Sequence, residues 1–236
     1  MIMLGKTCQV MHLGLVDYLE ALELQERLLR ERQAGDRGDT VVLLQHPPVI
    51  TMGRRGNLAN VLVSREDLAR QGIGLEEVNR GGDVTYHGPG QLVGYPVLRL
   101  ADHGNDVYRY LRMLEETIIL CLEGYGLRTE QQPGYTGVWM GSSKIAAIGV
   151  AIKGGVTMHG FALNVDPNLD HFRLIHPCGY SDRGVTSMAN ALGRSPDFKA
   201  VRDKLVKAFG RVFGTRMVIA KLAQGDDSPR TLGALL

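Results

Sequence analysis

Residues 144–165 read KIAAIGVAIKGGVTMHGFALNV, and this stretch decides the fold. The run from Ile145 to Ile152 is almost wholly apolar, and a second extended run from Val156 to Val165 follows the turn residues Lys153-Gly154-Gly155. Two short apolar runs joined by a glycine-containing turn are typical of a β-hairpin, whose strands pair antiparallel. The sequence therefore predicts a sheet with antiparallel pairing at this point.

Helical and extended patterns lie on both sides of the hairpin. Asp17 and Glu20 have the spacing of a helix N-terminal capping box, and Gly35 is a typical helix end. Residues 49–52 could extend a strand that breaks at His46-Pro47-Pro48. Periodicity predicts helices at 17–34, 106–123 and from a cap at Ser195, and strands at 40–45 and 92–98. Together these elements predict an α/β (α+β) fold, a mixed sheet with flanking helices.

Composition points to one soluble domain. The chain has 236 residues with 44% hydrophobic and 22% charged residues, near the averages of globular domains, and no boundary divides it, so we expect a single domain over 1–236 with a flexible tail from about 225. The net charge of +2 does not favour nucleic acid or a membrane surface as partner. No apolar run reaches membrane-spanning length and no signal peptide is visible, so we expect a cytoplasmic protein.

The three cysteines differ in their surroundings. Cys8, Cys121 and Cys178 are scattered and form no C-x-x-C pair, which disfavours a disulfide framework or a structural zinc site. Cys121 falls on the apolar face of a predicted helix and should be buried. Cys178 lies between Pro177 and Gly179 in a turn that could present a thiol to a cleft, although a free cysteine is more often a small buried hydrophobe.

Lys144 directly precedes the apolar strand of the hairpin. The ordinary interpretation is a solvated lysine at a strand end. A lysine at the mouth of a cleft could instead exchange a proton and stabilise a nearby thiolate. Lys144 and Cys178 are 34 positions apart, so only the fold can bring them together.

Four histidines and a glycine-rich loop leave several interpretations open. His87, His159 and His176 could be general bases, ligands or structural residues, and together with His171 they permit a zinc site, although no H-E-x-x-H or paired-cysteine spacing occurs. The Arg-Gly-Gly loop at 80–82 could cradle a phosphate, but it lacks the P-loop signature.

These clusters together resemble the lipoyl(octanoyl) transferase family over roughly residues 40–187. The matching stretches, in the family's order and spacing, are HPPVITMG at 46–53, RGGDVTYHGPGQL at 80–92, GVWMGSSKIAAIGV at 137–150, GVTMHGFALNV at 155–165 and PCG at 177–179. The resemblance implies a catalytic domain of the fold shared with biotin and lipoate protein ligases. The departures are Ile50, where an aromatic residue is common, and Ser142-Ser143, where charged residues often occur.

The resemblance also implies roles for particular residues. Cys178 would be the nucleophile that carries the acyl group as a thioester, and Lys144 would be its acid/base partner. The substrate-binding residues would be Arg80, Gly81, Gly82, Asp83, Val84, Thr85, Tyr86, His87, Ala147, Ile148, Gly149, Gly160, Phe161 and Ala162.

The implied reaction moves an octanoyl group from octanoyl-acyl carrier protein to a lysine ε-amino group on lipoyl domains. The expected acceptors are the lipoyl domains of 2-oxoacid dehydrogenase E2 subunits and the glycine cleavage H protein. Because the thioester donor is already activated, neither ATP nor a metal nor another cofactor is expected. A basic rim that includes Arg54, Arg55 or Arg80 would steer the acidic carrier. The chain is expected to act as a monomer, without nucleic acid or membrane partners.

Two other functions stay open on the sequence. One is an ATP-dependent lipoate or biotin protein ligase, which forms an acyl-adenylate and needs no nucleophilic cysteine. The other is a non-catalytic lipoyl- or biotin-sensing module, for which both Cys178 and Lys144 would be superfluous.

Overall fold

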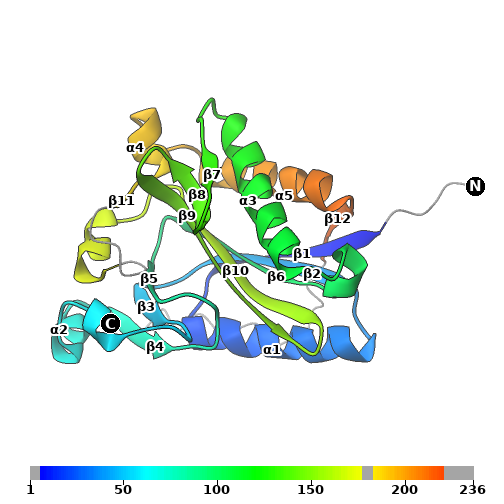
Figure 1. The fold of residues 1–236 in the computed structure, drawn as a ribbon, viewed down its shortest axis with the longest axis horizontal. Coiled ribbons are helices and arrows are strands. Elements are labelled where there is room, and N and C mark those ends of the chain that lie inside the picture. Colours follow the sequence, from blue (N-terminus) through cyan, green and yellow to red (C-terminus); the bar gives the residue numbers. More distant parts are fainter. Residues whose placement is uncertain (1–5, 177–182, 221–236) are drawn as a thin grey trace, which may run out of the picture.

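The predicted hairpin lies in the middle of a nine-stranded mixed sheet in the computed structural model, which describes residues 6–176 and 183–220 (Figure 1). Strands β9 (Ser143–Lys153) and β10 (Val156–Asn164) pair antiparallel. Along the sheet the strand order is β12-β1-β2-β6-β10-β9-β8-β7, and the short β11 (Gly184–Val185) pairs with β9 in parallel. The mixed sheet with flanking helices is therefore confirmed.

Several strands of this sheet have no counterpart among the predicted elements. Strand β1 pairs in parallel with both β2 and β12, although β1 and β12 are about 200 positions apart along the chain. Strands β2 (Asp39–Gln45) and β6 (Gln91–Val97) correspond to the strands predicted at 40–45 and 92–98. The strands without a predicted counterpart include β1 (Thr7–Leu15), β7 (Glu130–Gln132), β8 (Tyr135–Met140) and β12 (Arg216–Ile219).

A second sheet of three strands lies beside the first. It has the order β4-β3-β5, with β4 (Gly74–Glu77), β3 (Val49–Met52) and β5 (Val84–His87). The sequence suggested that residues 49–52 extend the preceding strand. In the structure they instead form β3 of the second sheet. Pro47 and Pro48 carry no backbone N–H, so the chain leaves the first sheet there and β3 pairs elsewhere.

The helices cover both faces of the large sheet. Helix α1 (Tyr18–Ala34) begins as predicted at Asp17, whose carboxylate accepts the N–H of Leu19 at 2.8 Å, and ends at Gly35 with φ of 90°. Helices α3 (Val107–Glu123) and α5 (Phe198–Phe213) pack against each other on the opposite side from α1 (Figure 1). The shorter helical elements are α2 (Arg65–Arg70), α4 (Met188–Leu192) and the 3₁₀ turns at Leu58–Asn60, Leu100–His103 and Leu169–Leu174.

Helix α5 starts later than predicted. Asp197, not Ser195, is its cap, and the Asp197 carboxylate accepts the N–H of Lys199 at 3.1 Å. A carboxylate two positions before a helical N–H satisfies a donor that the helix itself leaves unpaired, so Asp197 displaces the earlier serine as cap. None of the helices within 6–176 and 183–220 is both long enough and apolar enough to cross a bilayer.

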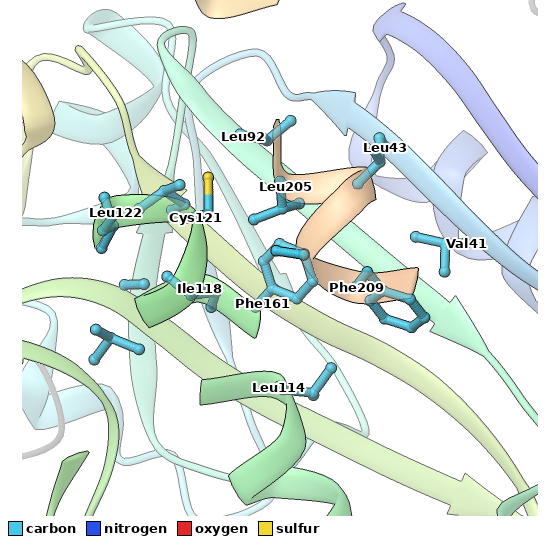
Figure 2. Close-up of a cluster of buried hydrophobic side chains, with 14 of the residues drawn as sticks. Val41, Leu43, Leu92, Leu114, Ile118, Cys121, Leu122, Phe161, Leu205 and Phe209 are labelled. Atoms are coloured by element: carbon cyan, nitrogen blue, oxygen red, sulfur yellow. The ribbon is translucent and has the colours of Figure 1, made fainter. Parts of the chain in front are cut away.

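The apolar core is split by the large sheet. On the side of α3 and α5, Leu114, Ile118, Cys121 and Phe161 meet in the cluster drawn in Figure 2. The prediction that Cys121 is buried is confirmed. Residues of α1 pack against the other face, and a third cluster fills the space between the second sheet, α2 and the turn at Leu169–Leu174. This arrangement leaves the region where the two sheets meet for the site.

Candidate active site

A cavity of about 930 Å³ lies where β9 and β10 approach the second sheet, and Lys144 lines it. Every described residue that the sequence predicted as substrate-binding lines the same cavity, with the exception of Tyr86. The fold therefore collects the three separate motifs of 80–87, 144–149 and 160–162 around one space. Cys178 lies outside the described residues.

Strand register places the hairpin residues of the site opposite one another. The cross-strand partners are Ala147 with Ala162, Ile148 with Phe161, and Gly149 with Gly160. Because side chains alternate along a strand, the two alanines and two glycines share one face, while Ile148 and Phe161 point to the other. Small residues thus make a smooth apolar strip that leads away from Lys144. The strip and Lys144 together span five residue steps, or about 17 Å at ~3.3 Å per residue.

The Arg-Gly-Gly loop closes against the edge of β9. Arg80 is buried, and its guanidinium donates to the carbonyl and the hydroxyl of Thr51 at 2.7 and 2.9 Å. The Gly81 N–H donates to the Val150 carbonyl at 2.8 Å, so this N–H is already paired within the protein. A Cβ on Gly149 would be 2.9 Å from the Gly81 carbonyl oxygen. Glycine at position 149 is what allows the loop to approach so closely.

Tyr86 does not reach the cavity because of the alternation along β5. Its ring lies in the third apolar cluster, 5.4 Å from that of Phe172, and its hydroxyl oxygen accepts from Nδ1 of His171 at 2.7 Å, because Nε2 of His171 faces the amide nitrogen of Asn168, a donor, at 3.2 Å. The neighbours Thr85 and His87 line the cavity instead. The structure therefore gives Tyr86 a packing role and separates it from the other predicted binding residues.

His87 is a buried residue of the cavity wall. Its Nδ1 lies 3.2 Å from Oε1 of Gln91, whose amide nitrogen donates to the side chain of Asn164 at 2.9 Å and to the backbone carbonyl of Tyr86. Since Gln91 Oε1 is an acceptor, Nδ1 of His87 carries the proton and Nε2 keeps its lone pair. Burial lowers the pKa of His87 well below its usual value, and the ring is neutral.

Two further buried histidines adjoin this wall. His46 donates from Nδ1 to the Val16 carbonyl and accepts the Tyr95 hydroxyl at Nε2, both at 2.7 Å. Nε2 of His159 lies 2.7 Å from Oδ1 of Asn79, and burial lowers the pKa of His46 and of His159 to about 4 each. Both rings are therefore neutral structural residues at neutral pH.

Lys144 lies on an aromatic platform at one end of the strip. Its Nζ is 4.8 Å from the ring centroid of Trp139, within the range of a cation–π contact. The guanidinium carbon of Arg183 stacks over Tyr135 at 3.7 Å and lies 4.9 Å from the same Trp139 centroid. Val185, the register partner of Lys144 on β11, also lines the cavity. The chain therefore returns to Lys144 directly after residues 177–182.

The two described cysteines are unsuited to nucleophilic chemistry. Burial raises the pKa of the Cys8 thiol and of the Cys121 thiol to about 12 each, so both are protonated at neutral pH. Neither lines the cavity. Within 6–176 and 183–220, no three His, Cys, Asp or Glu side chains come together in a way that could hold a metal ion. The described part of the chain therefore contains no set of ligands for the zinc site that the sequence left open.

Sequence reasoning missed several residues of the wall. Val107, Tyr108 and Leu111, on the first turns of α3, form one side of the cavity, and Tyr18 and Tyr95 form another. The only signal for them was an apolar helix face or a strand, which is equally typical of a core. Arg54 and Arg55 are exposed and line the cavity, whereas Arg80, which also lines it, is buried.

Comparison with known proteins gives a consistent result. The lipoyl protein ligase A/B catalytic domain matches residues 17–210. An octanoyltransferase of Caldicellulosiruptor saccharolyticus is 53% identical over 88% of this chain and 89% of its own, and one of Chloroflexus aggregans is 50% identical over 91% and 99%.

Solved structures show the same fold at much lower identity. A putative lipoate protein ligase of Thermoplasma acidophilum with bound lipoic acid has a TM-score of 0.71 and 17% identity, covering 92% of this chain and 90% of its own. A biotin protein ligase of Aquifex aeolicus has a TM-score of 0.54 and 15% identity, covering 87% and 70%. The expected likeness to both kinds of ligase is confirmed at the level of the fold. From the family match and the close relatives together, the chain belongs to the lipoyl protein ligase A/B catalytic-domain family and, within it, to the octanoyltransferases, which are acyltransferases.

Proposed function

We propose that this octanoyltransferase takes its acyl group from octanoyl-acyl carrier protein and transfers it to a lysine of lipoyl domains through a thioester on Cys178. The observation that carries the proposal is the position of Lys144 at the head of a strip of small residues inside the large cavity. An acyl chain laid along Ala147, Gly149, Gly160 and Ala162 would bury its methylenes at about 0.8 kcal/mol each. Lys144 would then face the reactive end of the chain.

In the first half-reaction the Cys178 thiolate attacks the thioester carbonyl of the donor. The bond to the phosphopantetheine sulfur breaks, and the Lys144 ammonium donates a proton to this leaving sulfur. In the second half-reaction the ε-amino group of the acceptor lysine attacks the new thioester. Neutral Lys144 accepts the proton that this amine loses, the amide forms, and Cys178 leaves as thiolate.

Two observations support Cys178 as the nucleophile. The other two cysteines are buried away from the cavity with raised pKa values. Arg183 and Val185, which follow the segment containing Cys178, lie beside Lys144 and its platform. Because a thioester donor already holds the energy for amide formation, the proposal requires no ATP, metal or other cofactor.

The proposed partners follow from the same reaction. The carrier would dock beside the exposed Arg54 and Arg55, which line the cavity, and the acceptors would be the lipoyl domains of 2-oxoacid dehydrogenase E2 subunits and the glycine cleavage H protein. We further propose that the enzyme works in the cytoplasm as a monomer.

The test is to mix the protein with octanoyl-acyl carrier protein in the absence of ATP and to follow the intact mass. We expect an octanoyl adduct that peptide mapping confines to Cys178 and that a lipoyl domain then discharges. Cys178→Ser should abolish the adduct, and Lys144→Met should slow its formation and discharge. Lys153→Met, at the exposed far end of the same strand, is the matched control and should behave as wild type.

A requirement for ATP together with free octanoate would contradict the proposal and favour the ligase alternative. An adduct on a residue other than Cys178 would contradict the assignment of the nucleophile.

A further inference from the structure

The side chain of Lys144 packs against a single glycine of the neighbouring strand. A Cβ built on Gly137 would lie 3.3 Å from Cε and 3.4 Å from Cδ of Lys144, and 2.7 Å from the Ala146 carbonyl oxygen. Gly137 also has a φ of 126°, a conformation that residues with a side chain rarely adopt. The pairing of β8 with β9 changes register at the next two residues, Val138 and Trp139. Gly137 thus shapes the space through which Lys144 reaches Trp139.

Gly137 is itself held by a buried carboxylate from another element. Glu115, on α3, has no exposed surface, and its Oε1 accepts the backbone N–H of Gly137 at 2.9 Å. The other oxygen, Oε2, accepts from the guanidinium of Arg112 at 2.6 Å. A buried carboxylate is costly unless its oxygens are paired, and here both have donors. The side chain reaches past its own helix to hydrogen-bond one glycine of β8.

We propose that Glu115 and Gly137 are positioning residues that hold the Lys144 side chain at the head of the acyl cavity. Glu115 fixes the backbone of Gly137, and the missing Cβ of Gly137 leaves room for the Lys144 methylenes against β8. The ammonium group is thereby kept over Trp139, where it lines the cavity. This inference rests on the proposed function, in which Lys144 exchanges protons with the thioester sulfur and the acceptor amine.

A pair of glycine substitutions tests the steric part. Gly137→Ala introduces backbone strain and a methyl group that lies against both the Ala146 carbonyl oxygen and the Lys144 side chain. Gly141→Ala, in the turn between β8 and β9, introduces strain alone, because Gly141 has a φ of 57° and no atom within 4 Å of a built Cβ. We expect Gly137→Ala to lower kcat by about tenfold to 100-fold with little change in KM for the donor, since small misplacements of a reacting group carry such penalties. Gly141→Ala should stay within about twofold of wild type.

A pair of glutamate substitutions tests the hydrogen bond. Glu115→Gln keeps an oxygen that can accept the Gly137 N–H, whereas Glu115→Ala removes it. We expect the glutamine variant to retain most of the kcat and the alanine variant to lose about tenfold or more. If Glu115→Ala fails to fold, as judged by circular dichroism, the comparison of Gly137→Ala with Gly141→Ala still decides the inference.

A second readout does not depend on catalysis. The rate at which a small amine-specific reagent labels Lys144, measured by peptide mapping relative to Lys153, reports where the amine lies. We expect this ratio to change in Gly137→Ala and Glu115→Ala and to remain unchanged in Gly141→Ala. Equal labelling and equal kcat in Gly137→Ala and Gly141→Ala would overturn the inference. Altered labelling with unaltered kcat would instead uphold the positioning and refute the proposed role of Lys144.

Discussion

Mild acid should destabilise this protein well above the pH at which its carboxylates titrate, because of two buried neutral histidines. His46 is fully buried and His159 nearly so, and burial lowers the pKa of each from 6.5 to about 4. In the unfolded chain both rings bind a proton below pH ~6.5, whereas in the folded protein neither does until pH ~4. The stabilisation is therefore complete above pH ~6.5 and is lost as the pH falls from ~6.5 towards ~4.

The size of the effect follows from the same pKa values. A difference of about 2.5 pH units corresponds to about 3 kcal/mol per ring at full extent. Between pH ~7.5 and ~5 the expected loss is about 2 kcal/mol per ring, or about 4 kcal/mol for both. This is a large part of a typical unfolding free energy of ~5–15 kcal/mol. His87, whose pKa is also lowered by burial, acts in the same direction.

The assay is urea unfolding at a series of pH values, followed by the fluorescence of Trp139, the single tryptophan of the chain. His46→Gln should remove about 2 kcal/mol of the loss between pH 7.5 and 5, whatever it does to stability at pH 7.5. The control His176→Gln changes an exposed side chain and should leave the slope as it is. A loss of less than about 1 kcal/mol between pH 7.5 and 5 would refute the argument from burial.

Three further predictions concern packing and docking. Gly94→Ala should destabilise the protein by about 1–3 kcal/mol and impair octanoyl transfer, because a Cβ there would be 2.2 Å from the ring of Phe161, a core residue that is also part of the cavity wall; thermal unfolding and KM for the donor measure the two effects. Leu114→Ala, in the centre of the core cluster, should lower the unfolding free energy by about 2–5 kcal/mol in urea titrations, and a loss below 1 kcal/mol would show that the site collapses without a cavity. Replacing Arg54 and Arg55 by glutamine should slow acylation by the carrier protein and flatten its dependence on salt, while the rate with octanoyl-pantetheine stays unchanged; an unaltered salt dependence would remove these arginines from the docking surface.

The central hairpin and the three long helices could be predicted from the sequence because their signals are local. An apolar run of eight residues, a Gly-Gly turn and a capping aspartate each bias the backbone over a few positions, whatever the rest of the chain does. Strands β1 and β12 carry no such signal, since their mutual pairing joins distant parts of the chain. The separate sheet formed by β3, β4 and β5 could not be predicted for the same reason.

The candidate site, too, could be predicted from the sequence only in part. The motifs, and through them the family, could be recognised from the sequence, because each motif, such as Arg-Gly-Gly or a lysine before an apolar strand, is a contiguous stretch of residues. Which face each side chain occupies was decided by pairing: β5 turns Tyr86 into the core and His87 into the cavity. Glu115 hydrogen-bonds Gly137, which is 22 residues further along the chain, and Arg80, the first residue of the Arg-Gly-Gly loop, is buried. Neither contact could be predicted from local sequence. Local patterns specify backbone conformation, whereas register and packing between distant segments specify which side chains meet, and that is a property of the tertiary structure alone.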